Sequence, residues 1–256
     1  MNSSRFTASK MGFALTASLA LALAACNGSE EGGDGAEVSG DPIAPIAAPE
    51  GTSWTETVTV TDEMGYLLGN PDAPIKLVEY ASHTCGACAM FSQTAKGPLK
   101  EKYISTGVVS FEQRELIRGF EDLMIATMVQ CGPKESMQPL SDQAWTNLND
   151  IMQTIQTNAN DYNAAGNLPP DKRFVAAAEA AGLIEYFAAR GLSADQARSC
   201  LADTKKIDAI QKASAAQAKE FNINATPTFL LNGKQLEERQ WPELEPILQR
   251  AGARSK

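Results

Sequence analysis

Hydrophobic and polar positions follow strand spacing in the first part of the chain after residue 50. Residues 54–61 largely alternate Thr with Trp or Val, which predicts a strand, and the apolar run at 75–82 predicts a second strand that is buried in a sheet. Turn-forming residues at 69–74 separate the two. We expect a helix from about 86 to 100, and a third strand at 107–116.

The spacing changes to that of helices over residues 119–200. The run "RFVAAAEAAGL" contains strong helix formers and stops at Gly182, a residue type that commonly follows a helix end. Ser193 and Gln196 have the spacing of a capping box. The whole stretch predicts helices joined by turns.

Strand spacing returns after this helical block. Residues 203–221 predict a helix, and "TPTFLLNGKQLE" predicts two strands joined by an Asn-Gly turn. Pro242 and Gly252 mark the expected start and end of a last helix. The order β, β-α-β, helical block, α-β-β-α predicts an α/β domain that a helical insertion interrupts, and periodicity alone does not identify that domain.

The first 25 residues have the pattern of a signal peptide. Residues 1–10 carry two cations and no acid, and residues 11–25 are almost wholly apolar but shorter than the ~20 residues of a membrane span. "LAAC", ending at Cys26, resembles a bacterial lipobox, whose cysteine is acylated. The alternative is ordinary cleavage after Ala24, with Cys26 incidental.

Composition then separates a tether from a domain. Residues 27–50 hold five Gly, three Pro, six acids and no Lys or Arg, so they bury little apolar surface to offset their ordering entropy. We expect residues 26–50 to be a lipidated, disordered tether and residues 51–256 to form the domain. The formal net charge of −9 argues against nucleic acid as a partner.

The five cysteines divide into three groups. An exported domain lies where disulfides persist, so with Cys26 assigned to lipid, Cys85 and Cys88 form one pair and Cys131 and Cys200 are left as a second. The second pairing is a hypothesis at this point. Neither of its cysteines belongs to a C-x-x-C motif, which favours a structural bond over a second redox centre.

The stretch "EYASHTCGAC" carries the chemistry. Cys85 immediately precedes the expected helix, whose first N–H groups lack intrahelical partners and favour negative charge there. The pKa of the Cys85 thiol should therefore be lowered. Cys88, three residues on, lies on the same side of the first turn. Cys85 would be the attacking thiol and Cys88 the resolving one.

Together with "ATPTF" at 225–229, this motif resembles the DsbA-like branch of the thioredoxin-fold thiol:disulfide oxidoreductases of the bacterial envelope. The resemblance covers residues 54–252 and implies a thioredoxin fold interrupted by the helical insertion. It further implies that Glu79 exchanges a proton with Cys88 and that a cis-proline loop at Thr226-Pro227 contacts an extended substrate. Some members also have a second disulfide in the insertion.

Other roles for these residues stay open in the sequence. Glu79 could be an exposed acid paired with Lys76, and Pro227 could be an ordinary trans-proline. We place His83 on the loop as a surface group that contacts substrate. Gly86 and Ala87 offer neither charge nor ring beside the thiolate, so we expect a reduction potential inside the range of about −120 to −270 mV that separates a strong oxidant from thioredoxin.

The resemblance implies a protein-disulfide oxidoreductase that needs no cofactor and no metal, acts on thiols or disulfides of exported proteins, and exchanges electrons with a membrane redox partner. Oxidase, reductase and isomerase directions stay open. The segment at 26–50 is too short and polar for a dimerisation domain, so we expect a monomer. The expected location is the periplasm, with a lipid anchor in the inner or outer membrane.

Two other classes of function compete. Cys85, Cys88 and His83 could bind copper or zinc, although a structural zinc site normally has four ligands. A non-catalytic envelope chaperone could instead use methionines of the helical block as an adaptable peptide surface. Those methionines are Met124, Met128, Met137 and Met152.

Overall fold

The computed structural model describes residues 40–254, so the proposed signal peptide and Cys26 lie outside the described residues. The strands are β1 (Val58–Val60), β2 (Tyr66–Gly69), β3 (Ile75–Ala81), β4 (Val109–Glu115), β5 (Thr228–Leu231) and β6 (Lys234–Gln235). The helices are α1 (Gly86–Lys102), η1 (Ile104–Thr106), α2 (Phe120–Val129), α3 (Lys134–Thr146), α4 (Leu148–Thr157), α5 (Ala159–Gly166), α6 (Pro170–Ala180), α7 (Leu183–Ala188), α8 (Ala194–Ala202), α9 (Thr204–Glu220) and α10 (Trp241–Arg250).

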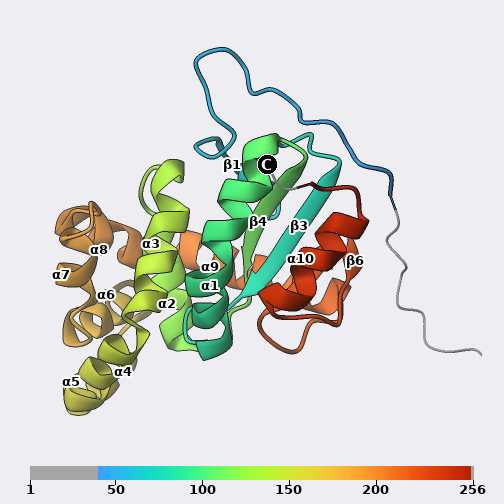
Figure 1. Cartoon of the computed structure of the whole chain (residues 1–256). Helices are drawn as coiled ribbons and strands as arrows, with labels where there is room; N and C mark the ends of the chain where they lie inside the picture. Colours follow the sequence, from blue (N-terminus) through green and yellow to red (C-terminus); the bar gives the residue numbers. More distant parts are fainter. Residues whose placement is uncertain (1–39, 255–256) are drawn as a thin grey trace, which may run out of the picture. The chain divides into compact units, whose positions relative to one another are not determined.

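The six strands form one mixed sheet in the order β1-β2-β4-β3-β5-β6 (Figure 1). Strands β3 and β4 are parallel and every other pair is antiparallel. Apolar side chains of α1 and α10 pack on one face of the sheet, and those of α9 pack on the other. The C-x-x-C motif lies between the end of β3 and the first turn of α1, and β3 lies inside the sheet between β4 and β5.

Helices α2–α8 occupy the interval between β4 and α9 (Figure 1). Their apolar side chains form a second hydrophobic core, which Tyr66 of β2 and Ile207 and Ile210 of α9 also join. A disulfide joins Cys131, just after α2, to Cys200 in α8. The capping box at Ser193 and Gln196 starts α8 as expected, and Gly182 has the positive φ of +68° that ends α6. The predicted α/β class, a thioredoxin fold with a helical insertion, is confirmed.

The structure corrects two predictions near the start of the domain. Only Val58–Val60 of the expected 54–61 strand is extended in the sheet, because Trp54 turns back and its indole N–H donates to the carbonyl of Ile46 at 2.8 Å. Strand β2 (Tyr66–Gly69) was not predicted; its four residues are all buried, so no alternation of polar and apolar positions marks it.

The tether prediction is wrong for residues 40–50. The Ile43 amide donates to the carbonyl of Gly252 at 3.0 Å, and the Ile46 amide donates to that of Thr106 at 2.8 Å. The side chain of Ile43 also packs on the core beneath α10. A few apolar residues and backbone hydrogen bonds therefore fix this part of an otherwise polar segment against the domain. Within residues 40–254, no helix has the length and apolar character needed to cross a membrane.

Candidate active site

Cys85 caps the N-terminus of α1. Its backbone is extended, with φ −92° and ψ 115°, and its Sγ accepts a hydrogen bond from the Cys88 amide at 3.3 Å. The first turn of α1 contains no acid that would oppose a negative charge there. Both Cys85 and Cys88 are free thiols in this structure, so it represents the reduced state.

The surroundings of Cys85 favour its thiolate. A hydrogen bond from the Cys88 thiol is the largest influence, and contacts with Thr226 and with the backbone N–H groups of Cys88 and Ala87 act in the same direction. Burial acts in the opposite direction, but these hydrogen bonds have the larger combined effect, and the pKa of Cys85 falls to about 5. Cys85 has the properties of an attacking thiol.

Cys88 has the opposite properties. It is fully buried one turn inside α1, and burial raises its pKa above the usual range of a thiol. The nearby charges of Glu79 and Cys85 raise it further. The two sulfurs therefore differ strongly in acidity, as an attacking and a resolving thiol must.

The loop before β5 closes over Cys85. The Thr226-Pro227 peptide bond is cis, and the Cys85 thiol donates to the carbonyl of Thr226 at 3.4 Å. The structure thus brings together residues that are 141 positions apart in the chain. It favours the expected cis-proline loop over an ordinary trans-proline.

Glu79 lies on β3 and is fully buried, and neither of its carboxyl oxygens has a hydrogen-bond partner among the described residues. Burial raises its pKa to about 8, Lys96 counteracts this, and Asp142 and Cys85 add to it. The alternative pairing with Lys76 is wrong, because side chains three positions apart on a strand point to opposite faces and Lys76 is exposed. Glu79 is placed to hold a proton near neutral pH.

Lys96 is a buried cation that the sequence analysis missed. Its Nζ donates to Gln113 Oε1 at 2.8 Å and to Asp142 Oδ1 at 2.6 Å, and it lies 4.6 Å from the centre of the Trp145 ring. A signal was present, since Lys96 is one turn beyond the buried Ser92 on the covered face of α1. The lysine supplies the positive charge that most affects Glu79 after burial.

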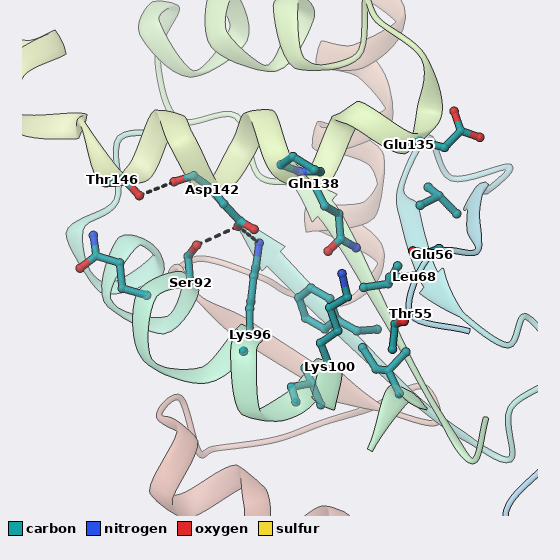
Figure 2. A pocket seen from close by; sticks show the side chains of 17 residues that line it. Thr55, Glu56, Leu68, Ser92, Lys96, Lys100, Glu135, Gln138, Asp142 and Thr146 are labelled. Carbon is teal, nitrogen blue, oxygen red and sulfur yellow. Dashed lines mark hydrogen bonds and ion pairs between the residues drawn. The ribbon is translucent and has the colours of Figure 1, made fainter. Parts of the chain in front are cut away.

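A cavity of about 500 Å³ borders this ion pair. Figure 2 shows Lys96 reaching from α1 to Asp142 on α3 at the cavity wall. Leu99, Phe111 and Val58 contribute apolar parts of the lining. The Asp142 side chain is 39 % exposed, so the buried charges near Glu79 connect with solvent on this side.

The prediction of a surface position for His83 is wrong. The ring is fully buried and stacks on Trp145, with 5.1 Å between the ring centres. Its Nε2 is 2.9 Å from Ser141 Oγ, and its Nδ1 is 3.2 Å from Glu115 Oε2. The loop before Cys85 turns inward because Glu115 of β4 and Ser141 of α3 provide polar contacts for the buried imidazole.

The same contacts disfavour the metal hypothesis, because both ring nitrogens of His83 face Ser141 and Glu115. Among residues 40–254, no group of three or more His, Cys, Asp or Glu side chains is arranged to hold a metal ion. The peptide-binding use of methionines also loses support, since Met124, Met128 and Met137 are core residues and only Met152 is exposed.

A second, smaller cavity of about 210 Å³ adjoins the active-site motif. Pro227 of the cis-proline loop, Ala87 of the motif and Trp241 at the start of α10 contribute to its walls. Met90, one turn into α1, is 54 % exposed at this place. An apolar groove thus begins next to Cys85.

Comparisons with known proteins agree with this geometry. A family model described as thioredoxin matches residues 61–250. A Rickettsia bellii protein named as a protein-disulfide oxidoreductase is 26% identical over 215 residues, covering 81% of this chain and 72% of that protein. A Rickettsia conorii protein of the same name is 30% identical over 178 residues, covering 68% and 55%.

Solved structures show the same architecture. A protein-disulfide isomerase from Novosphingobium aromaticivorans superposes with a TM-score of 0.68 at 25% identity, covering 73% of this chain and 97% of that one. Alpha-DsbA1 of Wolbachia pipientis gives a TM-score of 0.59 at 22% identity over 73% and 89% of the two chains, which supports the fold alone. The chain therefore belongs to the thioredoxin family and is a thiol-disulfide oxidoreductase.

Proposed function

We propose that the protein donates its Cys85–Cys88 disulfide to pairs of thiols in exported proteins. One observation carries the direction: the Cys85 thiolate is stabilised at the N-terminus of α1, and its pKa is about 5. A stabilised thiolate favours the dithiol form of the enzyme, which makes its disulfide a better oxidant.

The reaction would proceed in two exchanges. A substrate thiolate attacks Cys85 Sγ, the Cys85–Cys88 bond breaks, and the departing Cys88 sulfur takes the proton of Glu79. A second substrate thiolate then attacks the substrate sulfur of the mixed disulfide and releases Cys85 as a thiolate. The enzyme has then gained two electrons. The substrate has lost two protons to solvent, and solvent returns one of them to Glu79, which gave its own proton to Cys88. The net result is one proton released to solvent, with Cys88 protonated and Cys85 a thiolate.

Glu79 suits this role because burial raises its pKa, to about 8 in the reduced protein, which favours a protonated carboxyl near neutral pH, and because the charge of Glu79 is one cause of the raised pKa of Cys88. The groove beside Pro227 would receive the extended segment around the substrate cysteine. A membrane partner that carries a disulfide would take up the two electrons and restore the enzyme. The protein would act as a monomer in the periplasm, held by a lipid on Cys26 to the inner or outer membrane.

Mixed-disulfide trapping tests the assignment. The Cys88→Ser variant removes the resolving thiol, so it should accumulate exported proteins linked through Cys85, and the matched Cys85→Ser variant should trap none. Purified oxidised enzyme should also convert a short peptide with two thiols to its disulfide. Failure to oxidise this peptide would refute the donor direction, and a glutathione equilibrium would give the potential.

The anchor and the oligomeric state have separate tests. Labelling with a radioactive fatty acid should modify the wild-type protein and leave a Cys26→Ser variant unlabelled. Light scattering after gel filtration should give the mass of one chain for the domain that begins at Gly40.

A further inference from the structure

Two arginines flank the reactive cysteine of this acidic protein. Arg239 is the only charged residue among the described residues that line the groove beside Pro227. Its neighbours there are apolar or uncharged, and they include Met90 and Trp241. The groove therefore presents one positive charge to a segment that binds in it.

Arg118 also contacts the cis-proline loop. It follows β4, is exposed to solvent, and its Nη1 donates to Thr226 Oγ1 at 3.4 Å. The carbonyl of the same Thr226 accepts from the Cys85 thiol. Arg118 and the Cys85 sulfur therefore contact the same residue, Thr226, one through its hydroxyl and the other through its carbonyl.

Neither guanidinium has a carboxylate partner within residues 40–254. The nearby Asp122 is fully buried, and its oxygens already accept from Ser82, Thr84 and the Arg118 backbone. Glu237 and Glu238 precede Arg239 but do not line the groove. Both cations are thus available to a bound substrate.

We propose that the protein prefers substrate segments that carry an acidic residue within a few positions of the reactive cysteine. The proposal rests on the proposed function, because the segment must place its sulfur at Cys85. Opposite charges across an interface raise the association rate and fix orientation, and this effect weakens as salt rises. An exposed ion pair contributes modestly, so the expected preference is roughly 1.5- to 5-fold.

The test uses three short peptides with one cysteine flanked by Asp, Asn or Lys. The second-order rate at which each peptide thiol opens the Cys85–Cys88 disulfide is divided by its rate with a small soluble disulfide, which corrects for differences in thiol reactivity. We expect the corrected rates to fall in the order Asp, Asn, Lys, and the differences to vanish at high ionic strength.

The variants identify the residues responsible. Arg118→Gln and Arg239→Gln should each reduce the ratio of the Asp rate to the Asn rate, and the double variant should bring it close to one. Lys172→Gln makes the same change of charge on the exposed part of α6 and should leave the ratio unchanged. Equal rates for the Asp and Asn peptides, or a ratio unaffected in the double variant, would overturn the proposal. Failure of all three peptides to open the disulfide would instead refute the proposed function.

Discussion

The buried carboxyl of Glu79 should make the stability of the oxidised protein fall as pH rises. Its pKa is raised to about 8 in the folded state, above the ordinary value of 4.5 that applies to the unfolded chain. A group of this kind contributes fully below its unfolded pKa, and its contribution is lost as pH rises through the folded pKa. The pKa of about 8 includes a contribution from the Cys85 thiolate of the reduced protein, so in the oxidised protein the window of this effect begins near pH 4.5 and ends below about pH 8.

The magnitude follows from proton linkage. One proton held by the folded state and absent from the unfolded state changes the free energy of unfolding by at most about 1.4 kcal/mol per pH unit. The thiolate of Cys85 is one cause of the raised pKa, and the oxidised protein lacks it. We therefore expect a loss of roughly 1–2.5 kcal/mol across two pH units in the middle of the window.

Urea unfolding of the oxidised protein at several pH values measures this slope. Glu79→Gln keeps the shape of the protonated acid but cannot ionise, so the free energy of unfolding of this variant should show a flatter pH dependence. Glu101→Gln changes an exposed acid of α1 and should keep the wild-type slope. Parallel pH profiles for the wild type and Glu79→Gln would refute the reasoning, whatever their vertical offset.

The reduced protein provides an internal check, because Cys85 acts with the opposite sign. Its pKa is lowered to about 5, so its contribution is present above the pKa of an unfolded thiol and is lost as pH falls through about 5. Between about pH 5 and about pH 8 the slopes of Cys85 and Glu79 oppose each other. The free energy of unfolding should therefore depend less on pH in the reduced protein than in the oxidised one.

Three further predictions address other parts of the site and fold. Ultraviolet absorbance of the thiolate should titrate in the reduced protein with an apparent pKa of about 5 for Cys85, and a value near that of a free thiol would contradict the helix-cap argument. Replacing both Cys131 and Cys200 by Ala should lower the free energy of unfolding by about 4 kcal/mol while disulfide exchange continues, as urea unfolding and a peptide assay would show. Lys96→Met should raise the pKa of Glu79 above about 8, measured by NMR of the labelled carboxyl group, because the counteracting charge is lost; an unchanged pKa would show that Lys96 acts only through packing.

The sequence was sufficient where local chemistry determines the structure. Cys85 and Cys88 are positioned by one strand end and one helix start, and both signals lie within a few residues of the motif. The helical insertion was recognisable because its apolar residues keep helical spacing over a long stretch, and a long run carries a clear periodic signal. Residues 40–50 were mistaken for tether because composition averaged over a segment hides a few apolar contacts.

Long-range partners explain the failures at the site. His83 contacts Ser141 and Glu115, which are 58 and 32 residues away in the sequence. Lys96 pairs with Asp142, which is 46 residues away. A polar side chain is buried only when such partners arrive from other elements, and its own neighbours in the sequence do not reveal them. The inward position of His83 follows from the helical insertion as much as from the motif.

The dipeptide between the cysteines separates the backbone and side-chain contributions to the pKa of Cys85. Gly86 and Ala87 carry no charge or ring, and the sequence therefore predicted an intermediate oxidant. In the structure, the Cys88 thiol, Thr226 and the backbone N–H groups of Cys88 and Ala87 lower the pKa of Cys85 to about 5, so the dipeptide contributes through its backbone and not through a side chain. This value lies between the ≈ 3.5 of a strongly oxidising relative and the ≈ 7 of thioredoxin. Since the leaving thiolate sets much of the driving force, the reduction potential should also be intermediate. Substitutions that place a positive charge at position 86 or 87 should then lower the pKa of Cys85 further.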